Sequence, residues 1–202
     1  MEPQKIDAEA VDVIVANVQK RLEAHPGVLV VALDGMSGTG KTTISKEVAN
    51  RLDAVNVLCD DFFTGGRNSV WVKKSTQAMI DSVIDWRRIR REVIEPLKAG
   101  RAASWHPFNW KKFEGLDSKT ITAQPKHVVI LDGAFTARKE LSDVVDYTIL
   151  ITAPHEKRVR RVTEREGEDY SKDWHDTWQA SMDYYFTVMR PPESFNLIVE
   201  TS

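Results

Sequence analysis

The stretch at residues 35–42, GMSGTGKT, constrains the fold of this chain more than any other feature. It completes the pattern Gly-x-x-x-x-Gly-Lys-Thr and lies between an apolar run at 28–33 and a helical pattern at 42–52. Glycines in such a loop let successive backbone N–H groups point inward at phosphate oxygens, and the following helix N-terminus adds positive partial charge. A glycine-rich turn that binds nothing is the weaker interpretation, because both flanking elements are present. The stretch therefore predicts a phosphate-binding loop.

Strand-like apolar runs alternate with amphipathic helical patterns along the chain, which predicts an α/β fold with a mostly parallel, five-stranded sheet. The expected strands are residues 28–33, 54–59, 127–133, 146–152 and 195–200. The expected helices are residues 6–24, 42–52, 76–98, 154–166 and 173–189. The length of 202 residues favours a single domain, with residues 1–26 as a leading helix and residues 101–125 as a β-hairpin insert.

Composition narrows the function classes. With 28 basic and 30 acidic residues the formal charge is −2, so no global charge favours nucleic acid or an anionic membrane as a partner. The single cysteine, Cys59, excludes an intramolecular disulfide and favours a reducing compartment with a buried thiol. No apolar run reaches membrane-spanning length, and the acidic N-terminus lacks a signal-peptide pattern. We therefore expect a cytoplasmic protein without a membrane partner.

Three aspartates follow predicted strands. Asp60 and Asp61 come at the end of the second strand and Asp132 ends the third, at the sheet edge where open α/β sheets bind ligands. A carboxylate beside the γ-phosphate can accept the proton of an attacking hydroxyl or hold Mg²⁺. The alternatives are a solvated loop pair for Asp60 and Asp61 and a turn cap for Asp132.

Three arginines, Arg158, Arg161 and Arg165, fall on one face of a predicted helix. Converging guanidinium groups suit phosphate oxygens and the negative charge that develops during phosphoryl transfer. A basic run is more often a solvated face, but the phosphate-binding loop in the same chain reverses that preference.

Together these residues resemble the uridine kinase-like branch of P-loop kinases, which also contains phosphoribulokinase and pantothenate kinase. The resemblance spans residues 28–200, and its marks are GMSGTGKTT, DDFF at 60–63, DWRRIRREVIEPLKAGR, PFNW, LDG and the arginine helix. It implies a P-loop NTPase fold, a three-layer sandwich with a helical lid over residues 154–170. It also implies ATP as phosphate donor, Mg²⁺ as cofactor and a small hydroxylated metabolite as acceptor.

The resemblance assigns roles residue by residue. Asp60 matches the first aspartate of the family motif and would be the general base, with Asp61 secondary. Thr42 and Asp132 would hold Mg²⁺, with Asp60 as a further candidate, while Arg158, Arg161 and Arg165 would belong to the lid. Lys41 would contact the β- and γ-phosphates. The donor phosphates would lie against the loop residues Gly35, Met36, Ser37, Gly38, Thr39, Gly40, Lys41, Thr42 and Thr43.

The chain departs from the family on the acceptor side. Nucleoside-specific members carry an Asp-His-Pro-like segment before the DW helix, and here TQAMIDSVIDW has none, so Asp81 is a substitute candidate. An aromatic-Asp-aromatic pattern appears as Phe108-Asn109-Trp110, with an amide in place of the carboxylate. Trp105, Phe108 and Trp110 could stack on a planar acceptor or form a cluster that holds the hairpin, and Arg67 could contact substrate or phosphate.

The leading hypothesis is an ATP- and Mg²⁺-dependent kinase, with a nucleoside such as uridine or cytidine as the first acceptor to consider. A kinase of a non-nucleoside, such as a sugar phosphate, pantothenate or glycerate, follows from the missing tripeptide. A nucleotide-binding switch or regulatory ATPase is the rival of another class, although no water-positioning residue or switch segment is evident. Whether the chain forms a homo-oligomer stays open.

Overall fold

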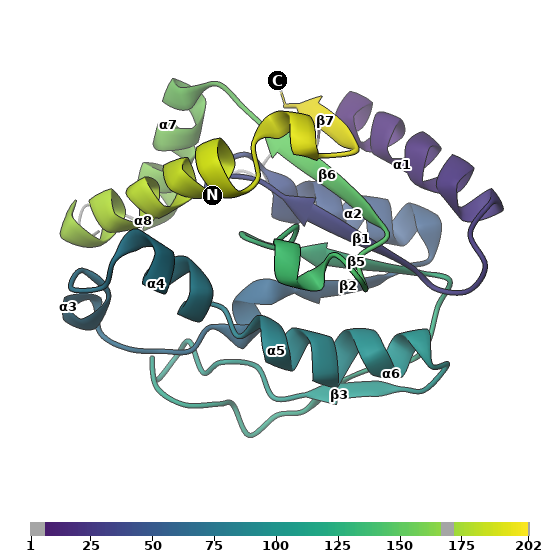
Figure 1. Cartoon of the computed structure of the whole chain (residues 1–202), viewed down its shortest axis with the longest axis horizontal. Coiled ribbons are helices and arrows are strands. Elements are labelled where there is room, and N and C mark those ends of the chain that lie inside the picture. Colours follow the sequence, from purple (N-terminus) through teal and green to yellow (C-terminus); the bar gives the residue numbers. More distant parts are fainter. Residues whose placement is uncertain (1–6, 167–171, 202) are drawn as a thin grey trace.

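The computed structural model describes residues 7–166 and 172–201, and its centre is a sheet of five parallel strands (Figure 1). The strand order is β2-β5-β1-β6-β7. The strands are β1 (Leu29–Asp34), β2 (Val55–Leu58), β5 (Val128–Asp132), β6 (Tyr147–Thr152) and β7 (Leu197–Glu200). The order places β1 between β5 and β6, so the loop that follows β1 opens at the middle of the sheet. The predicted α/β class and parallel sheet are confirmed.

Helices cover both faces of the sheet (Figure 1). One face packs against α1 (Ala8–Glu23) and α2 (Lys41–Leu52), through apolar side chains such as Ile14, Val18 and Val48. The other face packs against α4 (Thr76–Ser82), the helical run from α5 (Trp86–Arg88) to α6 (Glu95–Lys98), and α8 (Lys172–Tyr184). Two buried cores separated by the sheet give the three layers of a P-loop NTPase sandwich.

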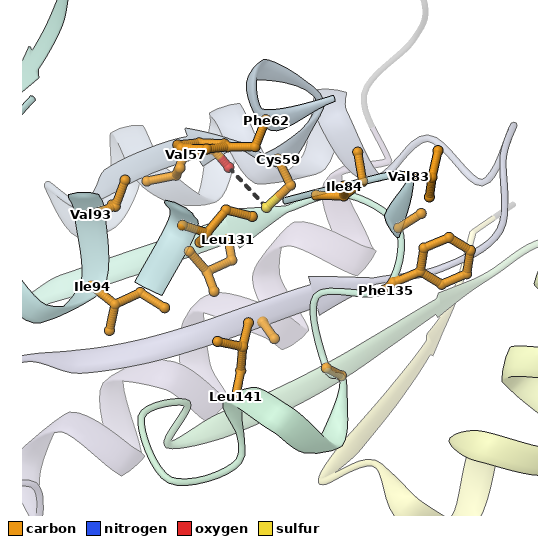
Figure 2. Close-up of a cluster of buried hydrophobic side chains, with 14 of the residues drawn as sticks. Val57, Cys59, Phe62, Val83, Ile84, Val93, Ile94, Leu131, Phe135 and Leu141 are labelled. Atoms are coloured by element: carbon orange, nitrogen blue, oxygen red, sulfur yellow. Dashed lines mark hydrogen bonds between the residues drawn. The ribbon is translucent and has the colours of Figure 1, made fainter. Parts of the chain in front are cut away.

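The second of these cores lies under the end of β2. Figure 2 shows Val57, Cys59 and Phe62 among side chains of the neighbouring helices and of the loop after β5. Cys59 is buried, as the sequence predicts, and burial raises the pKa of its thiol well above the ordinary value. A buried thiol of this kind packs as a small apolar side chain.

The single helix expected over residues 76–98 is wrong, because the chain breaks at 83–85. There the backbone pairs with residues 62–64: Ile84 bridges Phe63, and the Asp85 amide donates to the Phe62 carbonyl at 2.8 Å. The Asp85 side chain then caps the next helix by accepting from the Arg88 amide at 3.1 Å. Beyond Arg88 the helix widens into a π-helical segment, Ile89–Ile94, before α6. Long-range pairing therefore overrides a continuous helical pattern.

The remaining elements match their predictions, apart from small shifts at the ends. The insert holds an antiparallel pair, β3 (Ala103–Trp105) and β4 (Ile121–Ala123), which confirms the hairpin. The arginine helix is α7 (His155–Glu166), and the part of the predicted lid at 167–170 lies outside the described residues. Strand β2 ends one residue early, because Cys59–Phe62 forms a 3₁₀ turn, and the short helix α3 (Asn68–Trp71) was not predicted.

Candidate phosphoryl-transfer site

The loop at 35–42 connects β1 to α2, as the motif predicts. Gly38 and Gly40 have φ angles of 80° and 86°, in the left-handed region that favours glycine. A side chain at Gly38 would also collide with the backbone of Arg158. The first turn of α2 begins at once, with the Thr43 amide donating to the Gly40 carbonyl at 3.1 Å. The loop is therefore a backbone cradle that ends on a helix N-terminus.

Side chains of the loop brace it from within. The Thr39 hydroxyl donates to the Met36 carbonyl at 3.0 Å, and the Lys41 ammonium donates to the same carbonyl at 3.3 Å. Lys41 therefore lies across the loop, on the side where outer phosphates of a nucleotide would lie. The Met36 side chain packs against the core, which anchors the phosphate-binding loop.

Thr42 and Asp132, the two predicted magnesium ligands, meet beside the loop. Thr42 lies close enough to Asp132 to lower the pKa of its carboxyl, and the Ser45 hydroxyl donates to Asp132 Oδ2 at 2.9 Å. Burial raises the pKa of Asp132, while nearby Lys41 and these hydroxyl groups oppose that shift. Among the described residues, buried Asp132 Oδ1 has no hydrogen-bond partner. A buried carboxylate oxygen without a partner, beside a threonine hydroxyl, is the hard oxygen donor set that Mg²⁺ prefers, so the residues fit this ion.

Asp60 lies on the exposed side of the 3₁₀ turn that follows β2. Its charge raises the pKa of Asp132, which places the two carboxylates within electrostatic reach of each other. The turn is pressed against the loop after β5: a Cβ added at Gly133 would lie 2.7 Å from the Cys59 Cβ. The residues on either side of this contact are Asp60 and Asp132, so one backbone approach brings the two predicted carboxylates together.

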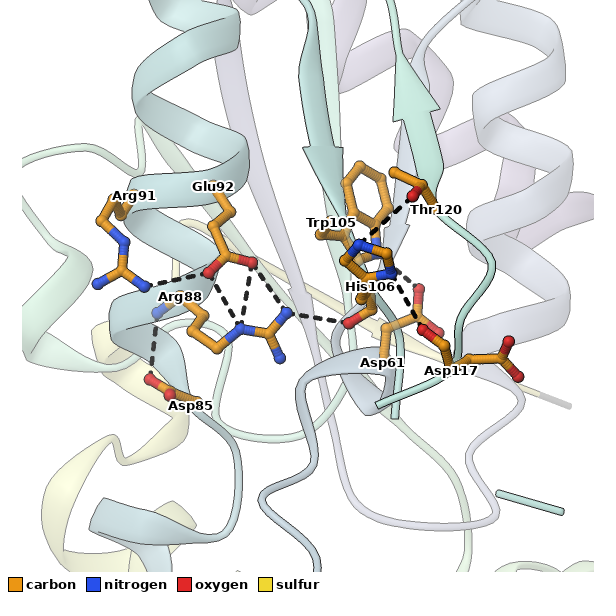
Figure 3. A network of polar contacts seen from close by, with 9 residues as sticks. All are labelled: Asp61, Asp85, Arg88, Arg91, Glu92, Trp105, His106, Asp117 and Thr120. Atoms are coloured by element: carbon orange, nitrogen blue, oxygen red, sulfur yellow. Dashed lines mark hydrogen bonds and ion pairs between the residues drawn. The ribbon is translucent and has the colours of Figure 1, made fainter. Parts of the chain in front are cut away.

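Asp61 faces the insert instead. Its Oδ2 accepts from the Trp105 indole N–H at 3.0 Å, and its carbonyl accepts from the Phe108 amide at 2.7 Å. Arg88 is near enough for its charge to act on Asp61, and Figure 3 shows that its guanidinium binds Glu92 and donates to the His106 carbonyl. Burial raises the pKa of Asp61, and the Trp105 N–H and Arg88 oppose the shift. Of the DD pair, Asp61 therefore has a clear structural partner in the insert.

The arginine helix touches the phosphate-binding loop. Arg158 is buried and donates to the Ser37 carbonyl at 3.4 Å, and Arg161 donates to the Gly38 carbonyl at 3.1 Å. Burial lowers the pKa of the Arg158 guanidinium. Arg165 is exposed in the last turn of α7. Two of the three predicted lid arginines thus lie at the loop rather than on a solvated face.

Most of the predicted acceptor residues are engaged in structural contacts. Trp105 and Phe108 are buried, and Phe108 packs edge-on against Phe63 with ring centroids 4.9 Å apart. The Asn109 side chain accepts from the Lys112 amide at 3.0 Å, which closes a turn of the insert. These contacts match the hairpin-cluster alternative for Trp105 and Phe108.

The three remaining acceptor-side candidates differ in how far they are engaged. Trp110 stacks on Phe63 at 5.2 Å but leaves half of its surface exposed. Asp81 accepts from the Arg138 guanidinium at 3.5 Å. Arg67 is exposed just before α3. Trp110 and Arg67 therefore have surface available to a ligand.

Sequence reasoning missed a buried carboxylate, Asp34, at the end of β1. It accepts from the amides of Gly35, Phe135 and Ala137 and from the Tyr185 hydroxyl, at 2.8–3.0 Å. Burial raises its pKa, and these donors oppose the shift. Asp34 thereby ties the start of the phosphate-binding loop to the loop after β5 and to the helical segment after α8. A carboxylate at the end of a fully apolar strand was the available signal.

Arg138 was missed as well. Its side chain is 1% exposed and pairs with Glu140 at 2.8 Å, while its guanidinium lies over the Trp86 ring. A further donor reaches the Ile80 carbonyl at 3.3 Å. Arg138 therefore joins the loop after β5 to α4 and α5. No local pattern indicates these contacts.

Comparisons with known proteins find similar sequences and structures along most of the chain. Residues 31–181 match the family described as an AAA domain. Curated uridine kinases from Macrococcus caseolyticus and Staphylococcus aureus are 22% and 24% identical over 166 residues, which is 80% of this chain and 78% of each relative.

Two solved structures share the fold. A possible uridine kinase from Bacillus stearothermophilus superposes with a TM-score of 0.70 at 16% identity, covering 95% of this chain and 97% of that one. A candidate fructose transport system kinase from Silicibacter also gives a TM-score of 0.70, at 19% identity over 94% and 98% of the two chains. The predicted resemblance to uridine kinase-like P-loop kinases is confirmed. Among the described residues, no helix combines the length and apolar character needed to cross a membrane.

Proposed function

The chain belongs to the AAA domain family of P-loop proteins and groups with the uridine kinase-like P-loop kinases, and from that premise we propose that it transfers the γ-phosphate of ATP to a hydroxyl of a small metabolite. One observation carries the proposal. The phosphate-binding loop, the Thr42–Asp132 pair and Asp60 converge at the carboxyl ends of adjacent strands. Donor phosphates, metal and acceptor hydroxyl need this proximity for in-line transfer.

Each group has one task in this proposal. The loop amides and Lys41 hold the donor phosphates, and Thr42 and Asp132 hold Mg²⁺, which neutralises charge on the β- and γ-phosphates when bound. Asp60 accepts the proton of the acceptor hydroxyl as that oxygen attacks. Arg158 and Arg161 release the loop carbonyls and turn toward the transferred phosphoryl group.

The assay is ADP release from ATP and Mg²⁺ over a panel of hydroxylated metabolites. We expect Asp60→Asn to lower the rate with the true acceptor by about 10²- to 10⁴-fold, the range for loss of a general base, with ADP affinity kept. Asp61→Asn is the matched control, because its amide oxygen can still accept from Trp105, and it should lose far less. Near-native transfer by Asp60→Asn would overturn the assignment of the base.

Nucleosides such as uridine and cytidine are the first acceptors to test, because the curated relatives are uridine kinases. A non-nucleoside acceptor of the sugar phosphate, pantothenate or glycerate type is the second candidate. It is favoured because the side chains of Asp81 and Asn109, two of the acceptor-side candidates, bond to the protein itself. Thermal-shift competition separates the two, since a ligand that binds the folded state raises its apparent stability.

ADP release that no acceptor stimulates would instead favour a nucleotide-binding switch or regulatory ATPase. A cytoplasmic location and a single kinase domain over residues 1–202 remain parts of the proposal.

A further inference from the structure

A chain of polar side chains lies behind the proposed magnesium position. Asn56 Nδ2 in β2 donates to Ser45 Oγ in α2 at 3.2 Å, and Ser45 Oγ donates to Asp132 Oδ2 in β5 at 2.9 Å. Three elements that meet only in the folded chain therefore share one hydrogen-bonded line. Neither Ser45 nor Asn56 belongs to the phosphate-binding motif.

The geometry directs the serine proton. Ser45 is fully buried and its hydroxyl has one proton, with two acceptors in reach: Asp132 Oδ2 at 2.9 Å and the Thr42 carbonyl at 3.1 Å. The Asn56 amide donates to the hydroxyl, and an ionised Asp132 carboxylate has no proton to donate, so Ser45 acts toward Asp132 as a donor. A donor that itself accepts a hydrogen bond is strengthened by polarisation in a low-dielectric interior.

The two oxygens of Asp132 consequently differ. Oδ2 accepts from Ser45, whereas Oδ1 has no hydrogen-bond partner among the described residues although it is buried. Holding one carboxylate oxygen fixes rotation of the group and leaves the other oxygen aimed in a single direction. Partners behind a metal ligand often act this way, orienting the ligand.

We propose that Ser45 and Asn56 are positioning residues that present Asp132 Oδ1 to Mg²⁺. This inference rests on the proposed function, because it takes Asp132 as the magnesium ligand.

The test measures metal binding rather than turnover. Mn²⁺ accepts the same oxygen ligands as Mg²⁺ and is visible by electron paramagnetic resonance, so its affinity for the protein·ADP complex is the readout. We expect Ser45→Ala to weaken Mn²⁺ binding about tenfold, at the lower end of the range for outer partners of metal ligands. ADP affinity without metal should stay unchanged, since the hydrogen bonds of the Ser45 hydroxyl go to Asp132, Asn56 and the Thr42 carbonyl and to none of the loop amides.

Asn56→Ala provides a second variant on the partly exposed edge strand, and it tests the same line if Ser45→Ala does not fold. It should give a smaller loss, and the double variant should bind Mn²⁺ no more weakly than Ser45→Ala alone, because Asn56 acts through Ser45. Ser45→Cys keeps the size of the side chain with a weaker donor and should fall in between.

Ser181→Ala is the matched control. Ser181 is also a fully buried helical serine, and its hydroxyl donates to the Thr177 carbonyl of its own helix at 2.9 Å. It should lower stability without changing Mn²⁺ affinity. If folded Ser45→Ala or Asn56→Ala binds Mn²⁺ with wild-type affinity while Asp132→Asn binds it much more weakly, the positioning role alone is overturned. An Asp132→Asn variant that binds Mn²⁺ normally would instead overturn the metal site of the proposed function.

Discussion

Gly133→Ala probes the contact that brings Asp60 and Asp132 together. The added methyl would lie 2.7 Å from the Cys59 Cβ and 3.6 Å from the Cys59 Cα and the Thr136 Cγ2. Unstrained carbon atoms approach to about 3.5–4.0 Å, so the first contact is about 0.8 Å too short. Backbone lies behind both Cβ atoms, and neither can rotate away. The turn after β2 and the loop after β5 must therefore move apart.

The cost follows from two opposing effects. Overpacking a tight contact costs about 1–3 kcal/mol. Gly133 is not among the glycines with positive φ, so alanine fits its backbone conformation. Alanine also stabilises the folded state by about 0.4–1 kcal/mol, because it restricts the unfolded chain. The net loss should be about 1–2 kcal/mol, or about 2–8 °C in Tm for a chain of this length. Displacing two reacting groups by about 1 Å should cost about 100-fold in kcat.

Urea unfolding measures the first effect and acceptor-dependent ADP release the second. Gly100→Ala is the control, because Gly100 has a φ angle of 70° and open space around it at the end of α6, away from the site. It should lose comparable stability through backbone strain and keep kcat. A Gly133→Ala protein with wild-type stability and wild-type kcat would refute the contact argument, and lost stability with full kcat would separate the contact from catalysis.

Two further substitutions test the buried polar groups that join the loops around the site. Arg138→Met keeps most of the buried volume but leaves the Ile80 carbonyl without its donor, so urea unfolding at pH 7 should show a loss of about 1–3 kcal/mol. The hydrogen bond from Arg138 lowers the pKa of Glu140, so its stabilisation is present above the unfolded pKa of Glu140 and is lost as pH falls through the lower folded value. The difference in unfolding free energy between wild type and variant should therefore shrink toward about pH 3. A difference that stays constant with pH would contradict this origin. Tyr185→Phe removes one of four donors to buried Asp34 and should cost about 1.5–3 kcal/mol by the same assay, whereas a neutral effect would mean that the hydroxyl does not hold the carboxylate.

The local parts of the site were predictable and the long-range parts were not. The phosphate-binding loop is written in eight consecutive residues, and the strand-end position of Asp132 follows from the apolar run before it. Tyr185, by contrast, reaches Asp34 across 151 residues, and Arg138 reaches Ile80 across 58. Such contacts depend on which helix covers which face of the sheet, and helical periodicity gives no register for that choice.

The break at 83–85 has the same cause. Its residues continue the helical apolar pattern, but the backbone of Ile84 finds a partner in Phe63, which lies 21 positions earlier. Hydrophobic periodicity indicates which side chains are buried, but it does not indicate which backbone groups pair with a distant segment. The predicted helix was therefore right about burial, since Val83 and Ile84 are both buried, and wrong about backbone conformation.

Strand β2 is common to both proposals, because among the described strands it lies at the edge of the sheet and pairs with β5 alone. Its pairing with β5 ends at Leu58 and Asp132, so no β2–β5 ladder pair holds Asp60, two residues further on. Beyond that point two contacts replace the ladder. The Cys59–Gly133 approach limits the separation of the proposed base and metal ligand, and the Asn56–Ser45–Asp132 line fixes the direction of the ligand oxygen. A sheet edge alone leaves both quantities free, so a phosphoryl-transfer site built here requires these two contacts in addition to the loop that holds the phosphates.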